Sequence, residues 1–173
     1  KGAVSEKAKL ITFHKSNPLL PIIENLMVKS DNLTAELLIK TIGFEANKNQ
    51  GNWENGLKEV RIFIHDSIGI DTTTFSIQDG SGVSRYNYAS PSHFIELLKW
   101  AYNNEAIRDD FINTLPNSMP DGVLNKRDLP NKVYAKTGSL SGVSTLSGYI
   151  FTNSGEIVAF SILMNGFKGH SLP

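Results

Sequence analysis

The chain has 173 residues, 40% of them hydrophobic, and its 17 basic and 17 acidic residues give a formal net charge of zero. This hydrophobic content is sufficient for a buried core and excludes an intrinsically disordered chain, while the neutral balance offers no basic surface, so we expect no nucleic-acid partner. The sequence contains no cysteine, which excludes disulfides and thiolate metal sites. No apolar run approaches the length of a membrane span.

The first two thirds of the chain are predicted to be mainly helical. Weak alternation predicts a short strand over residues 9–15, and β-branched residues predict another over residues 72–77. Gly43 is expected to end the second helix, and residues 47–55 form a polar loop. Helical spacing of apolar residues predicts helices over residues 20–27, 34–42, 56–68, 90–102 and 105–114.

The last third of the chain has a different pattern. Strands are predicted over residues 133–135, 146–152 and 157–164, with a hairpin turn at Asn153-Ser154-Gly155. Helices followed by an antiparallel meander predict an α+β fold with helices packed on one sheet. The sequence opens on a charged connector and stops at residues 170–173, just after an apolar strand, so we expect a piece of a longer domain.

Two short motifs contain residue types that acyl-transfer chemistry requires. Lys136-Thr137-Gly138-Ser139 follows a predicted strand, and Ser30-Asp31-Asn32 directly precedes a predicted helix. A lysine–threonine–glycine triplet alone recurs by chance, and serine or asparagine before a helix is an ordinary cap. Together and in this order, the SDN and KTG triplets are two of the three motifs of serine acyl-transferases that act on penicillin.

A stretch between these motifs makes the resemblance more specific. The segment DGSGVSR, at residues 79–85, lies between KSDNLTAELLIKTIG and YAKTGSLSGVSTLSGYI. This arrangement resembles the D-Ala-D-Ala carboxypeptidase/endopeptidase family, the class C low-molecular-mass penicillin-binding proteins. Class A β-lactamases share SDN and KTG, but they lack the DGSG stretch and have an ExxLN motif that is missing here. The resemblance implies a penicillin-binding, β-lactamase-like fold, of which residues 1–173 are an incomplete C-terminal part.

The third family motif, SxxK, is missing from the sequence. No serine is followed by lysine three residues later, and the nearest imitation, Thr12-Phe13-His14-Lys15, lies in a strand-like segment. In the family, the serine of SxxK is the nucleophile, its lysine is the base, and the motif opens a helix upstream of SDN. We therefore expect the nucleophile to come from the N-terminal rest of the same polypeptide, and this chain alone to be inactive.

The resemblance implies roles for the residues of both motifs. In this family a serine attacks the D-Ala-D-Ala peptide bond, and water then hydrolyses the acyl-enzyme. Ser30 would relay a proton to the leaving amine, and Asn32 would bind the substrate carbonyl. Lys136 would bond Ser30 and attract the terminal carboxylate of the substrate, which Thr137 would bind directly.

The remaining expected site residues bind the substrate. A Cβ at Gly138 would crowd a substrate strand added at the sheet edge, and the N–H of Ser139 would be one oxyanion-hole donor. Arg85 and Leu140 would line a pocket for an acidic peptide side chain, although Arg85 could equally bond loop carbonyls. Residues 79–82 are expected to shape a turn.

No metal or cofactor is expected. The histidines show no spacing typical of metal ligands; they are His14, His65, His93 and His170. Trp53 and Trp100 are interpreted as packing residues. The expected ligands are the peptidoglycan stem peptide and β-lactams. By resemblance, we expect a location outside the cytoplasm, in the periplasm or cell envelope.

Three alternatives remain open at this point. The same fold could be a catalytically inactive module that binds peptidoglycan peptides, or it could be a β-lactamase. A non-enzymatic α+β domain would require three ordered motif matches to be accidental. The resemblance favours a serine-type peptidase, without separating carboxypeptidase from endopeptidase activity.

Overall fold

The computed structural model describes residues 5, 7–48, 50–127, 129 and 131–168, and it has the α+β architecture that the sequence predicts. Within these residues, no helix is both long and apolar enough to cross a membrane. The elements, in chain order, are α1 (Leu19–Lys29), α2 (Asn32–Asn47), α3 (Trp53–Phe63), the π-helical turn η1 (Ile64–Ile68), α4 (Pro91–Asn103), α5 (Arg108–Thr114), the 3-10 turn η2 (Asn125–Arg127), β1 (Lys132–Leu140), β2 (Val143–Phe151) and β3 (Ile157–Asn165).

The three strands form one antiparallel sheet in the order β1-β2-β3, and the predicted hairpin joins β2 to β3. Its register pairs Ala135 with Gly148 and Gly138 with Thr145. β1 is longer than predicted, because pairing with β2 continues through the KTG motif to Leu140. The motif therefore lies inside a strand, where its backbone is fixed by the sheet.

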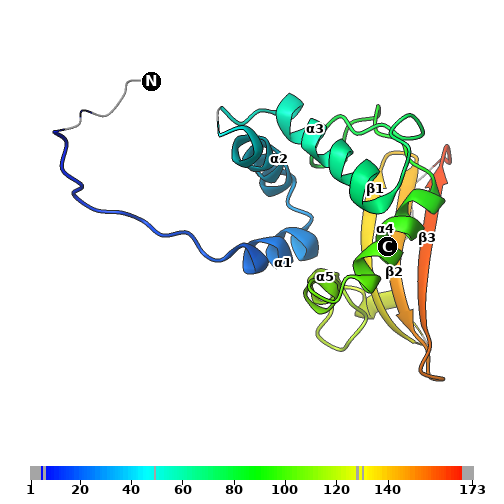
Figure 1. The fold of residues 1–173 in the computed structure, drawn as a ribbon. Coiled ribbons are helices and arrows are strands. Elements are labelled where there is room, and N and C mark those ends of the chain that lie inside the picture. The colour runs from blue at the N-terminus through cyan, green and yellow to red at the C-terminus, as the bar shows by residue number, and fades with distance from the viewer. Residues whose placement is uncertain (1–4, 6, 49, 128, 130, 169–173) are drawn as a thin grey trace.

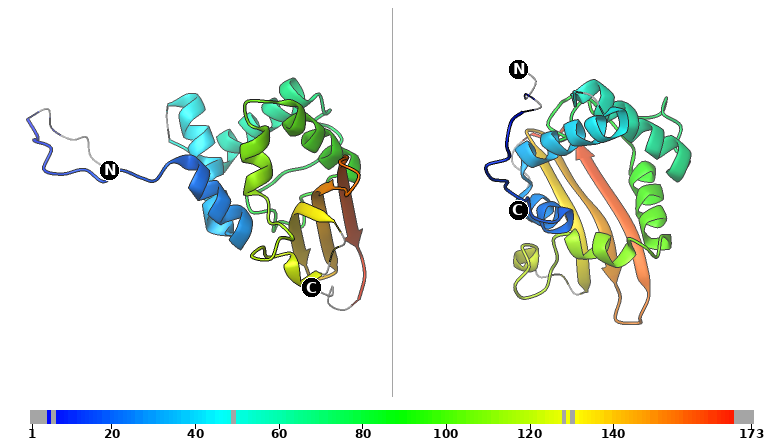
Figure 2. Two further views of the ribbon diagram at one scale, coloured as in Figure 1. Left: turned by 90° about the horizontal axis from the view of Figure 1, so that it is seen from below. Right: turned by 60° about the vertical axis from the view of Figure 1, so that its left-hand side comes forward.

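Helices α4 and α5 cover one face of the sheet (Figures 1 and 2). On this face Tyr149, which is 1% exposed, packs with Leu98, Ile112 and Leu115. The Tyr149 hydroxyl donates a 2.6 Å hydrogen bond to the carbonyl of Leu98 on α4. Because side chains alternate along a strand, Val133 and Ala135 of β1 lie on the opposite face, where they pack with Leu124. Both faces of the KTG strand are thus anchored in apolar clusters.

Gly43 does not end a helix, contrary to the prediction. It lies within α2, where a Cβ would stand 2.7 Å from the backbone nitrogen of Gly56 on α3. A Cβ at Gly56 would in turn lie 1.9 Å from the carbonyl oxygen of Ile39. Both glycines allow α2 and α3 to cross at close range, so tertiary packing explains a residue that the local pattern assigned to a helix end.

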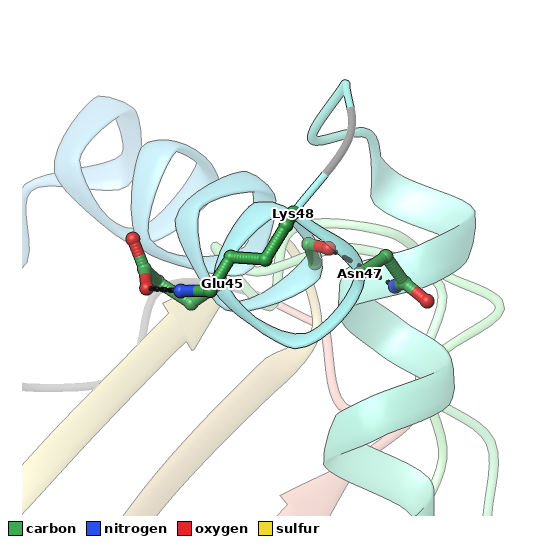
Figure 3. A network of polar contacts seen from close by, with 4 residues as sticks. Glu45, Asn47 and Lys48 are labelled. Atoms are coloured by element: carbon green, nitrogen blue, oxygen red, sulfur yellow. Dashed lines mark hydrogen bonds and ion pairs between the residues drawn. The ribbon is translucent and has the colours of Figure 1, made fainter.

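Helix α2 ends one turn later, at Asn47 (Figure 3). The Asn47 side chain donates to the Gly43 carbonyl at 3.0 Å, and Lys48 follows in the left-handed conformation, with φ of 50°. An exposed ion pair joins Lys48 to Glu45. Helix α3 begins earlier than predicted, at Trp53, because the Asn52 side chain accepts a 2.8 Å bond from the N–H of Asn55.

Two predicted strands are absent from the described residues. Residues 9–15 form an extended arm that runs away from the helices (Figures 1 and 2), with Ile11 95% exposed. Without a neighbouring strand, an isolated segment of this kind gains no ladder hydrogen bonds. At residues 72–77 only Ser76 forms a bridge, to Tyr88, because Asp71 accepts from Thr73 and folds the start of the segment into a turn.

Candidate active site

A contact between Lys136 and Ser30 is the centre of the site. The Nζ of Lys136 donates to the Ser30 hydroxyl, across 106 residues of sequence, and also to the carbonyl of Thr137 at 2.8 Å. Burial lowers the pKa of the Lys136 amine below its ordinary value. Both predicted motifs therefore meet, and their meeting point contains a hydroxyl and an amine that can exchange a proton.

The helical wall of the site consists of Ser30, Asp31 and Asn32, at the junction of α1 and α2. Ser30 ends α1 with φ of 52°, a left-handed conformation that turns the chain sharply before α2 begins. Asp31 caps α2: its carboxylate accepts from the N–H of Leu33 at 3.1 Å and from the Thr34 hydroxyl at 2.6 Å. As the sequence predicts, Asp31 bonds locally, which leaves Ser30 facing Lys136.

The strand wall of the site consists of residues 136–140 of β1. The outer edge of β1 is covered near its start, where the N–H of Ala135 donates to the Pro116 carbonyl at 2.8 Å. Successive backbone groups alternate in direction along a strand, so the N–H groups of Thr137 and Ser139 point toward the same outer edge. No other strand of the described residues pairs with β1 there. The strand wall thus presents backbone groups to which an extended peptide could add.

Gly138 lies in the middle of the strand wall and faces β2. A Cβ there would meet the hydroxyl oxygen of Thr145 at 2.5 Å, so the sheet itself favours glycine at this position. The expectation that a Cβ would crowd a substrate strand stays a prediction.

The DGSGVSR segment forms a tight loop beside the strand wall. Asp79 accepts from the N–H groups of Gly82 at 2.7 Å and Ser84 at 2.6 Å, which confirms that this residue shapes the turn. At the end of the loop, Arg85 donates to the carbonyl of Ser141 at 3.1 Å. Since Ser141 follows Leu140, the structure places the two predicted pocket residues at the same end of β1, with the arginine bonded to a loop carbonyl.

The sequence interpretation missed Glu36, one helical turn after Asn32. Its carboxylate accepts from the N–H groups of Gly80 at 3.1 Å and Ser81 at 3.0 Å, and from the Trp53 indole at 2.7 Å. Burial alone would raise the pKa of this carboxyl, but the hydrogen bonds from Ser81, Gly80 and Trp53 outweigh it and hold the pKa below its ordinary value. The four-residue spacing from Asn32 is the one sequence signal that could have indicated it.

An apolar cavity of about 560 Å³ lies beside the strand wall. It is bounded by α3, η1 and α4 on one side and by the DGSG loop on the other, and it extends to Gly138. Its lining includes Phe63, Phe75, Phe94 and Leu97. The described residues thus leave an apolar space next to the KTG motif.

The histidines that the structure describes do not gather into a metal-ligand set. Among the described residues, no group of three or more histidine, aspartate or glutamate side chains is arranged to hold a metal ion. His93 instead packs edge-on against Phe75 and accepts from the N–H of Ser90 at the start of α4. His170 lies outside the described residues.

Comparison with known proteins identifies the family. The family model of the D-Ala-D-Ala carboxypeptidase 3 (S13) family matches residues 1–173. The chain belongs to this family. The predicted resemblance to D-Ala-D-Ala carboxypeptidases is thereby confirmed, and with it the assignment to a family of serine-type peptidases.

Two D-alanyl-D-alanine carboxypeptidases are similar along most of the chain. The D-alanyl-D-alanine carboxypeptidase DacB of Haemophilus influenzae is 32% identical over 94% of this chain and 35% of its own length. The D-alanyl-D-alanine carboxypeptidase of Actinomadura sp. is 36% identical over 95% of this chain and 31% of its own length. The chain thus spans about a third of the length of these relatives.

A solved structure of a penicillin-binding protein supports the fold. Penicillin-binding protein 4 (dacB) from Haemophilus influenzae, in complex with a β-lactam, superposes with a TM-score of 0.81 at 32% identity, covering 92% of this chain and 38% of that one. A β-lactamase from Chitinophaga pinensis superposes with a TM-score of 0.67 at 20% identity, which indicates a shared fold alone.

Proposed function

We propose that this chain is part of a serine-type D-alanyl-D-alanine carboxypeptidase/endopeptidase that cleaves peptidoglycan stem peptides through an acyl-enzyme. The observation that best supports this function is the contact between Lys136 and Ser30, which joins the SDN and KTG motifs at a free strand edge. Membership of the S13 family agrees with this chemistry. We further propose that the protein acts outside the cytoplasm, where its cell-wall substrate lies.

Proton transfer to the leaving amine would use Ser30. A hydroxyl both donates and accepts, so Ser30 can give its proton to the departing D-alanine nitrogen and recover one from its neighbours. The Lys136 amine is hydrogen-bonded to Ser30, and burial lowers its pKa. It would supply that proton or stabilise the Ser30 oxygen. Asn32 begins α2 beside Ser30, and its exposed amide is available to donate to the substrate carbonyl.

Substrate would bind as an added strand along the strand wall. The outward N–H of Ser139 would be one donor to the oxyanion, and the Thr137 hydroxyl would bind the terminal carboxylate, which Lys136 attracts by charge. Gly138 would let the peptide approach the backbone closely. This arrangement uses strand addition for affinity and the cation for selection of a free carboxyl end.

The pocket for the peptide side chain would lie at the end of β1. Arg85 bonds the Ser141 carbonyl through one Nη atom, so the rest of its guanidinium can accept an acidic partner next to Leu140. An acidic group such as the distal carboxylate of diaminopimelate fits this chemistry. The stem peptide and β-lactams are therefore the proposed ligands.

We propose that the nucleophile belongs to a segment of the same polypeptide outside these residues. The sequence contains no SxxK, and the chain spans about a third of its curated relatives. The apolar cavity beside Gly138 offers a surface on which a helix with an apolar face could pack next to the KTG motif. Such a segment would complete both the oxyanion hole and the acylation site.

Acylation by a fluorescent penicillin tests the proposal. The 173-residue chain is compared with a longer form of the protein that includes the upstream sequence. Labelling of the longer form alone, blocked by excess unlabelled penicillin, is expected. A longer form that is folded but never labelled would overturn the proposed enzyme and favour a module that only binds peptides. Rapid turnover of the acylated form would instead point to a β-lactamase.

A further inference from the structure

Glu36 joins three segments that are distant in the sequence. Its two carboxylate oxygens accept from the backbone of the DGSG loop and from Trp53 at the start of α3, while the residue itself belongs to α2. Hydrogen bonds to an ionised carboxylate are about twice as strong as those between neutral groups. Glu36 therefore attaches the loop to the helix through its strongest available type of contact.

These bonds close a ring of contacts around the site. Asn32 and Glu36 are four residues apart and share one face of α2. From Glu36 the path continues through Gly80 to Arg85, which bonds the Ser141 carbonyl at the end of β1. β1 then leads back to Lys136 and its contact with Ser30 at the start of the helical wall. Each link is a hydrogen bond, a secondary-structure element or, between Gly80 and Arg85, the loop that Asp79 holds together.

We propose that Glu36 is a positioning residue that sets how the helical wall faces the strand wall, and that it thereby determines the placement of Asn32 and Arg85 around the substrate. This inference rests on the proposed function, because both walls are assigned to one active site. Glu36 itself touches no reacting atom. It acts by fixing the rotation of α2 relative to the DGSG loop.

A purely structural role for Glu36 would predict a different result. If its only task were to hold α2 against α3, the bond from the Trp53 indole would be the important one, and Trp53→Phe would reproduce the loss. If the loop bonds matter, Glu36→Gln has the larger effect. An amide offers one oxygen, whereas Gly80 and Ser81 donate to different oxygens of Glu36, so the amide nitrogen would oppose one of the two N–H groups.

Two measurements test the inference. Amide hydrogen exchange on the 173-residue chain measures the exchange rates of the Gly80 and Ser81 N–H groups. E36Q should raise both rates, because these N–H groups lose their carboxylate acceptor. The rate of acylation by penicillin, measured on the longer form, should fall roughly 10- to 100-fold in E36Q, the size of effect expected from a misplacement of about 1 Å. E24Q, the same change at an exposed glutamate of α1, is the matched control and should leave both measurements unchanged.

Gly80→Ala provides a second route to the same result. A Cβ at Gly80 would lie 2.6 Å from the Ala35 carbonyl oxygen and 2.6 Å from Ile39, so it should push the loop from α2 while Glu36 is intact. A lower acylation rate in both E36Q and G80A, with wild-type rates in W53F and E24Q, would support the inference. Wild-type acylation in E36Q with released loop amides would overturn it. Failure of the wild-type longer form to be acylated would instead overturn the proposed function, on which the inference rests.

Discussion

β1, which contains the KTG motif, is paired along its whole length with β2 and packs against two buried apolar clusters. The α1–α2 junction at Ser30, in contrast, buries few side chains. Helix α1 has no buried residue, and Gly43 is the single buried residue of α2. Besides the α2–α3 crossing, the helical wall is positioned by polar contacts at Asp31, at Glu36 and between Ser30 and Lys136. Sheet packing therefore fixes the strand wall, whereas directional hydrogen bonds supplement the close α2–α3 crossing in fixing the helical wall.

This difference has a consequence for substitutions. In the sheet that contains the strand wall, a change of shape at a buried or closely paired position disturbs the packing and lowers the free energy of unfolding. On the helical wall, an exposed polar side chain can be removed with little effect on stability, because few buried atoms depend on it. We expect activity and stability to separate between the two walls.

The largest expected effect is a loss of activity on the helical wall. Ser30→Ala in the longer form should lower the acylation rate or the release of D-alanine by on the order of 10²- to 10⁴-fold, the usual contribution of a positioned proton-transfer group. Its unfolding free energy should change by less than about 0.5 kcal/mol. The control is Ser67→Ala, at an exposed serine of η1. Full activity in the Ser30 variant would remove Ser30 from the proposed mechanism.

The largest expected effect on stability is at the sheet. A Cβ at Gly148 would lie 2.0 Å from the Tyr134 carbonyl oxygen and 2.5 Å from the Cα of Ala135, both backbone atoms. Gly148→Ala should lower the free energy of unfolding by about 3 kcal/mol in a urea titration. Gly138→Ala is the matched comparison: its nearest obstacle is the Thr145 hydroxyl, which can rotate away, so the stability loss should be smaller. Equal losses would contradict the steric argument.

A polar bond within the sheet core should have the next largest effect. Tyr149→Phe leaves the Leu98 carbonyl of α4 without its buried partner, at a cost of about 1 to 3 kcal/mol. Burial, and more weakly Tyr102, raises the pKa of Tyr149 to about 12. The unfolded chain then loses this proton more readily than the folded one, so the stabilisation by Tyr149 is complete below about pH 10 and falls as the pH rises toward 12.

Urea titrations at neutral and alkaline pH check both statements. The stability difference between wild type and Tyr149→Phe should shrink above about pH 10, because the folded wild type then opposes ionisation of a buried phenol. A difference that stays constant across this range would contradict the raised pKa.

The sequence predicted the elements around both walls in part: the helices on either side of Ser30 and the strands β2 and β3 were expected, but β1 was expected to end at residue 135, before the strand wall. Apolar runs of strand length in β2 and β3, separated by the turn residues Asn153-Ser154-Gly155, allowed the meander and its hairpin to be recognised from local pattern. Gly43 was misread because its reason lies in Gly56, on another helix. Glu36 was missed for the same reason: its partners at Gly80 and Ser81 are 44 and 45 residues away and are backbone groups without a sequence signature. SDN and KTG were found because motif resemblance, unlike periodicity, contains information on distant contacts.

The smallest expected effect is the loss of the helix cap at Asp31. The Thr34 hydroxyl hydrogen bond, opposed by partial desolvation and aided by the Thr34 and Leu33 N–H groups, holds the pKa of Asp31 below its ordinary value of 3.8. A carboxyl with a lowered pKa stabilises the fold above its unfolded pKa and loses this contribution as the pH falls through the folded pKa.

Asp31→Ala should therefore lower the melting temperature slightly at pH 7, and the difference from wild type should vanish in acid below the lowered pKa. Asp31→Asn, which keeps an acceptor for the N–H groups, should recover part of the loss at pH 7. Because the Asp31 cap fixes the start of α2 next to Ser30 and Asn32, a fall in acylation rate larger than the fall in stability would indicate that this hydrogen-bonded cap helps to hold the helical wall in place.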